Sequence, residues 1–80
     1  PNMSPEIVLF PSINTGNFTV QSSSLIQNIS IADLMGKTVY RQNNIEQKTL
    51  NIELTSHPGL YFVHVFAENG ESVKKMVLTR

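Results

Sequence analysis

The side chains in this sequence that could carry out chemistry are few and scattered. There are two histidines, His57 and His64, and no cysteine. A zinc site needs three or four Cys, His or carboxylate ligands brought together. Neither histidine has an acidic cluster beside it in the sequence. We therefore expect no metal ion, and nothing else in the pattern calls for a cofactor.

Acid–base and nucleophilic catalysis are equally poorly supported. A catalytic carboxylate needs a second acid or a base within reach, and no spacing around Asp33 supplies one. Asp33 precedes Leu34-Met35-Gly36, where a short acid typically caps a turn by accepting backbone N–H bonds. The serines of 22–24 lie in a polar stretch without a paired base. We predict that the chain is not an enzyme.

Length and charge exclude further classes. A chain of 80 residues has material for one domain. Its six basic and six acidic residues balance, whereas a nucleic-acid binder carries a basic excess. The richest apolar run, Leu60–Phe66, is far shorter than the roughly 20 residues of a membrane-spanning helix. No nucleic-acid partner is expected, and stability must come from packing and backbone pairing.

Apolar and polar residues alternate with a period of two along most of the chain. Such alternation places one face of a strand in the core and the other in water. Leu50, Ile52 and Leu54, for example, alternate with Asn51 and Glu53. Seven short strands with frequent turns predict an all-β antiparallel β-sandwich. The predicted strands span residues 6–10, 17–21, 27–34, 37–42, 49–54, 60–67 and 72–79.

Glycines separate the predicted strands. Glycine is the default residue wherever φ is positive, so we assign these glycines to backbone geometry. They are Gly16, Gly36, Gly59 and Gly70. Asn69-Gly70 is the strongest turn signal in the chain and predicts a type I′ hairpin between the last two strands.

The last two predicted strands differ from the others. Residues 60–66 are apolar on both faces, which is typical of a strand covered on both sides. We predict that one face, Tyr61, Val63 and Val65, lies in the core. The other face is the better candidate for docking a partner, and it consists of Phe62, His64 and Phe66.

The final strand has two interpretations. Lys74 and Lys75 could form a solvated edge that discourages chance strand pairing. Alternatively, a partner recognises the two lysines and Val77 by adding a strand to this edge. An open edge also raises the hypothesis of a homodimer formed through it.

Three blocks of residues follow one another along the chain in a recognisable order. The first block contains Pro11, Gly16 and Phe18, with Ser12 and Ile13 after the proline. The second block consists of Ile29, Ile31, Asp33, Gly36, Lys37 and Val39. The third block consists of Gly59, Leu60, Tyr61, Phe62, Val63, Val65, Asn69, Gly70, Lys74, Lys75 and Val77. Together the blocks resemble the C-terminal sorting domain of the type IX (Por) secretion system of Bacteroidota, which has Asn and Pro where this chain has Ser12 and Ile13.

The resemblance implies an immunoglobulin-like sandwich that directs a cargo protein across the outer membrane. Its partners would be the type IX translocon, outer-membrane shuttle components and a cell-surface peptidase that removes the domain. The domain would pass through the periplasm and reach the outer-membrane surface or the medium. Residues 1–6 would end a linker from upstream cargo, and residues 7–80 would form the sorting domain.

The resemblance places recognition on the final hairpin and terminal strand, and structural turns at Gly16, Asp33 and Gly36. The recognition residues would be Gly59, Tyr61, Phe62, Val63, Val65, Gly70, Lys74, Lys75 and Val77. The alternative is a structural or glycan-binding module of immunoglobulin-like or fibronectin-like fold, which fold alone cannot separate from a sorting domain.

Overall fold

The computed structural model describes residues 6–79, and these residues form strands and turns without a helix. None of them therefore belongs to a helix that could cross a membrane. The strands are β1 (Ile7–Phe10), β2 (Ile13–Asn14), β3 (Asn17–Asp33), β4 (Thr38–Gln42), β5 (Gln47–Glu53), β6 (Gly59–Ala67) and β7 (Gly70–Leu78). The all-β class is confirmed. The predicted linker lies outside the described residues except for Glu6.

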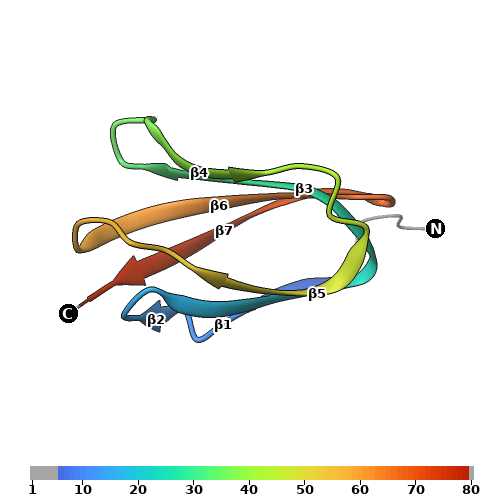
Figure 1. Cartoon of the computed structure of the whole chain (residues 1–80), viewed down its shortest axis with the longest axis horizontal. Helices are drawn as coiled ribbons and strands as arrows, with labels where there is room; N and C mark the ends of the chain where they lie inside the picture. Colours follow the sequence, from blue (N-terminus) through green and yellow to red (C-terminus); the bar gives the residue numbers. More distant parts are fainter. Residues whose placement is uncertain (1–5, 80) are drawn as a thin grey trace.

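β3 is a single strand of 17 residues where the pattern predicted two strands, 17–21 and 27–34. Its first part pairs with β1 and β5, and its second part pairs with β4 and β6. Two register shifts, between Gln21 and Asn28, let it turn from one layer to the other, as Figure 1 shows. The serines continue the strand because they stay paired: Ser23 N donates to Glu6 O over 3.0 Å.

All seven strands belong to one sheet with the order β1-β3-β6-β7-β2, and β4 and β5 also pair with β3. Because β3 bends, the sheet folds over on itself and is nearly closed. Every pair is antiparallel except β2–β7, where Ile13 and Asn14 pair in parallel with Val77 and Leu78. This parallel pair departs from the predicted antiparallel arrangement, and the sequence analysis assigned no strand to residues 13–14, because a two-residue strand leaves no period to detect.

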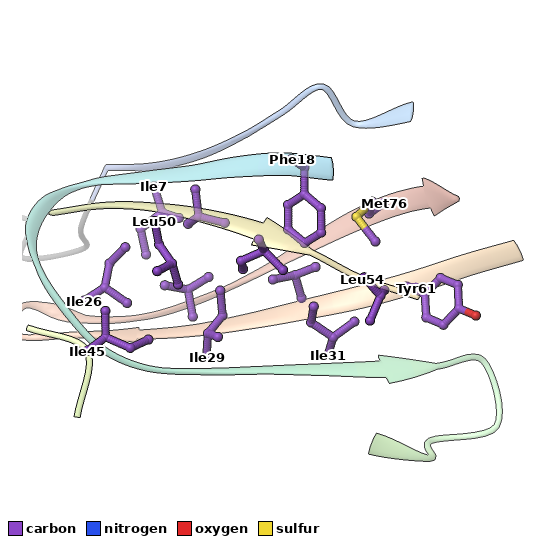
Figure 2. Packing of buried hydrophobic residues seen from close by; sticks show 14 of the residues in the cluster. Ile7, Phe18, Ile26, Ile29, Ile31, Ile45, Leu50, Leu54, Tyr61 and Met76 are labelled. Carbon is purple, nitrogen blue, oxygen red and sulfur yellow. The ribbon is translucent and has the colours of Figure 1, made fainter. Parts of the chain in front are cut away.

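The core lies between the two layers of the folded sheet, and its side chains point into that space in Figure 2. Burial follows the predicted alternation of apolar and polar residues. Each Å² of apolar surface that is removed from water stabilises the fold by about 25 cal/mol. The core positions predicted in β6 are confirmed, since Val63 and Val65 are fully buried and Tyr61 is 4% exposed. The core consists of Ile7, Phe18, Val20, Ile26, Ile29, Ile31, Ile45, Leu50, Ile52, Leu54, Tyr61, Val63, Val65, Met76 and Leu78.

The turn between β6 and β7 differs from the predicted type I′ hairpin. Ala67 pairs with Gly70, so Glu68 and Asn69 are the turn residues. The described non-glycine residues with positive φ are only Asn44 and Glu46, so Asn69 does not adopt the type I′ conformation. Bonds to β3 explain the difference: Glu68 N donates to Leu25 O over 2.9 Å and holds the tip against the bend of β3.

The turn between β3 and β4 is the capped turn that the sequence predicts. Asp33 Oδ1 accepts hydrogen bonds from Met35 N and Lys37 N, each 2.9 Å long. Gly36 follows with a φ of 84°, a region that glycine adopts without steric penalty. The role of Asp33 as a cap is confirmed, and its carboxylate is occupied by the turn.

Candidate recognition surface

The two faces of the β6–β7 hairpin have different surroundings. Tyr61, Val63 and Val65 point into the core, and Tyr61 OH also donates to Ser56 Oγ over 2.9 Å. These three residues of the predicted recognition set cannot touch a partner directly in the folded domain. They shape the hairpin from within, between Gly59 at the start of β6 and Gly70 at the start of β7.

The other side chains of the hairpin lie on its outer side, which we call the outer β6–β7 face. Opposite residues on this face are pairs without mutual backbone bonds, whose side chains approach closely. Phe62 is 36% exposed and lies across from Lys75, and Val73 is 56% exposed. The face consists of Leu60, Phe62, His64, Phe66, Glu71, Val73, Lys75 and Val77. It is therefore an apolar stripe with charged groups at intervals.

The two lysines of β7 point to opposite sides of the sheet. Lys75 belongs to the outer β6–β7 face, and Lys74 is half-buried on the inner side. Lys74 borders an open gap between β7 and β1, which Ile7 and Val8 also line. Of the two adjacent lysines, Lys75 thus belongs to the outer β6–β7 face and Lys74 to the gap beside β1. A partner bound on the outer face would therefore contact the side chain of Lys75 but not that of Lys74.

The side chains of His64 and Glu71 contact each other across the outer β6–β7 face, with Nε2 and Oε1 2.6 Å apart. The imidazole also stacks on Phe66, with ring centroids 4.1 Å apart and planes inclined by 20°. Both side chains are partly exposed to water, so the contact contributes little stability but holds the side chains in one arrangement. Within residues 6–79 no group of three or more His, Cys, Asp or Glu side chains could hold a metal ion.

The first sequence block forms a clamp on the end of β7, a role that the sequence analysis missed. Asn14 is 7% exposed; its Nδ2 donates to Pro11 O over 2.9 Å and its Oδ1 accepts from Gly16 N over 2.8 Å. The backbone oxygen of Asn14 accepts from Thr79 N over 2.7 Å, and Ser12 O accepts from Val77 N over 2.8 Å. The signal for it was Asn two residues before Gly, which favours an Asx turn.

Asn14→Ala should lower the free energy of unfolding by about 1–3 kcal/mol, because it leaves the buried Gly16 N–H without an acceptor. The measurement is urea denaturation followed by circular dichroism. The matched control is Asn51→Ala, which removes an exposed side-chain bond to Thr19 and should change stability by less than about 0.5 kcal/mol. Equal losses in both variants would contradict the clamp.

The geometry thus defines a small all-β module with a clamped terminal strand and one exposed hairpin face. The family model for the secretion system C-terminal sorting domain matches residues 8–79. The chain belongs to this family, the sorting domains of the type IX secretion system. The match includes the clamp, the capped turn and the hairpin. No curated protein matches the chain.

Proposed function

We propose that this domain directs an attached cargo protein across the outer membrane through the type IX translocon. The observation that carries the proposal is the extent of the family match, which covers the described fold from β1 to the end of β7 rather than one motif. The domain acts by being bound, without a catalytic step and without a cofactor. It passes through the periplasm and reaches the outer-membrane surface or the medium with its cargo.

The proposed partners are an outer-membrane shuttle component and the translocon, and they dock on the outer β6–β7 face. Exposed apolar residues beside charged ones are the usual composition of a binding surface. Phe62 and Val73 supply the apolar part, and Lys75 lies across from Phe62 and between Val73 and Val77 along β7. A cell-surface peptidase then removes the domain by a cut in the linker at or before residues 1–6.

The same proposal includes an immunoglobulin-like arrangement of the strands. One layer would contain β1, β5 and the first part of β3, and the other β4, β6, β7 and the second part of β3. This arrangement matters for function because it keeps the outer β6–β7 face on the outside of a layer, away from the core. A partner can then bind the folded domain without opening it.

Fusion of residues 1–80 to the C-terminus of a periplasm-directed fluorescent protein should make its export depend on the translocon. The fusion is expressed in a Bacteroidota host with and without a working type IX translocon. The reporter should appear outside the cell only when the translocon works, and fluorescence of the medium and the cell surface measures it.

A fusion that carries the Val63→Asp variant is the matched control, because a charge at this fully buried position unfolds the domain. That variant should stay in the periplasm. Retention of the unmodified fusion in both strains, with the domain folded and intact, would contradict the proposal and favour the structural or glycan-binding alternative.

A further inference from the structure

On the side away from β6, most of β7 has no backbone pairing within residues 6–79, although β1 approaches it across the gap that Lys74 borders. β7 pairs with β6 from Gly70 to Leu78, but with β2 only at Val77 and Leu78. Val77 N points toward β2, where it donates to Ser12 O over 2.8 Å. Backbone groups alternate in direction along a strand. The N–H and C=O groups of the alternate residues Glu71, Val73 and Lys75 therefore face away from β6, beyond the end of β2.

These three residues are self-complementary in charge and in spacing. Glu71 and Lys75 lie two residues to either side of Val73, and all three side chains are exposed on the outer face. In an antiparallel pair of two β7 strands with Val73 opposite Val73, each Glu71 lies opposite a Lys75. Opposite charges at directly facing positions stabilise an antiparallel pair.

We propose that the open edge of β7 binds the β7 edge of a second copy of this chain, antiparallel and centred on Val73. The two copies are related by a two-fold axis, and their sheets continue through the contact. The inference does not depend on the sorting function, because it follows from the strand edge alone. The occupant is a second copy because its charges match those of the edge without any further assumption.

Centring on Val73 is also the one register that pairs all three free residues with one another. A shift toward the hairpin tip by two residues leaves Lys75 opposite the turn. A shift in the other direction places Glu71 opposite Val77, whose N–H already donates to Ser12 O. In the centred register the inner-side Lys74 lies opposite Ser72, so no like charges face each other.

The hydrogen-bonding contact between Glu71 and His64 is compatible with this pairing. Glu71 uses Oε1 for His64, and its other carboxylate oxygen remains for Lys75 of the second copy. The contact is short, because only the edge between Glu71 and Lys75 is free. It is far smaller than the roughly 1,200–2,000 Å² of a standard interface, so the dimer is weak and exchanges rapidly.

The test is sedimentation velocity of the chain and of two charge variants over a concentration series. Glu71→Lys and Lys75→Glu each place like charges opposite one another, so each should weaken self-association by about tenfold or more. A mixture of the two variants restores both opposite-charge pairs, one copy carrying two lysines and the other two glutamates. The mixture should associate as tightly as the original chain.

The mixture also separates the effect of charge pairing from the loss of the contact between Glu71 and His64. The Glu71→Lys variant lacks that contact both alone and in the mixture, so recovery in the mixture must come from charge pairing. Val73→Pro removes the edge N–H without breaking a bond to β6, so it should abolish association. Val73→Thr keeps the N–H and the branched shape, and should still associate. The proposal would be overturned if either single variant dimerised as tightly as the original chain, or if the mixture did not recover association. Dimers that persist on dilution would also overturn it, because they would indicate that the two copies exchange a strand instead of pairing edge to edge.

Discussion

Gly16→Ala should lower the free energy of unfolding by more than about 3 kcal/mol, a large part of the stability of a small domain. A Cβ at this position would lie 2.5 Å from the backbone oxygen of Leu54, and a backbone atom cannot move aside as a flexible side chain can. Leu54 N also donates to Gly16 O over 2.7 Å, so separating the two segments breaks a bond. The φ of 122° adds strain for any residue with a side chain.

Gly36→Ala is the matched control for this prediction. Gly36 also has a positive φ, 84°, but nothing lies within 4 Å of a Cβ built there. Its replacement should therefore cost only the conformational strain, about 1–2 kcal/mol. Urea denaturation of both variants separates the two effects. Equal losses of stability in the two variants would show that the backbone at Gly16 and Leu54 moves apart to admit the new methyl group. The close approach of these two segments would then not be rigid.

The sequence predicted the core well because a period of two reports which face of a strand is buried. Val63, Val65 and Tyr61 were placed inside from that pattern alone, and they are buried. The continuity of β3 was not predictable in the same way. The serines at 22–24 look like a loop locally, but Ser23 pairs with Glu6 and Ser24 Oγ accepts from Asn69 N over 3.4 Å. Those partners are distant in the sequence.

The candidate surface was predicted in outline and missed in detail. Lys74 and Lys75 were treated as one feature because they are adjacent, whereas adjacent residues of a strand face opposite sides. The same alternation would have placed Val73 beside Lys75 on the outer face. The clamp by Asn14 could not be found from periodicity, since β2 is two residues long and pairs with a strand at the far end of the chain.

Deletion of residues 73–80 is expected to trap cargo in the periplasm. This result would have two possible causes, the loss of the docking surface and the unfolding of the domain. The deletion removes the fully buried Met76 and the 3% exposed Leu78 from the core, and it uncovers β6. Loss of such side chains lowers stability by about 2–5 kcal/mol each. The domain would unfold, so retention alone would not locate the docking surface.

The double variant Phe62→Ser and Val73→Ser tests the docking surface without removing the strand. Phe62 is 36% exposed and Val73 is 56% exposed on the outer β6–β7 face, so the fold should lose about 1–3 kcal/mol of stability through the apolar surface that both side chains still bury. Export of the fluorescent fusion should fall by about tenfold or more, since removing apolar anchors from a binding surface weakens binding by at least that factor. The measurement is extracellular fluorescence with the thermal midpoint of the purified domain.

The matched control is Val8→Ser with Met35→Ser, because these side chains are 51% and 90% exposed but lie outside the hairpin. The control removes exposed apolar surface from β1 and from the β3–β4 turn, and its fusion should still be exported. If the hairpin variant is exported normally while folded, docking uses another face. If both variants are retained, export responds to any loss of surface hydrophobicity, and the outer β6–β7 face has no special role. Only retention of the hairpin variant alone assigns recognition to this face.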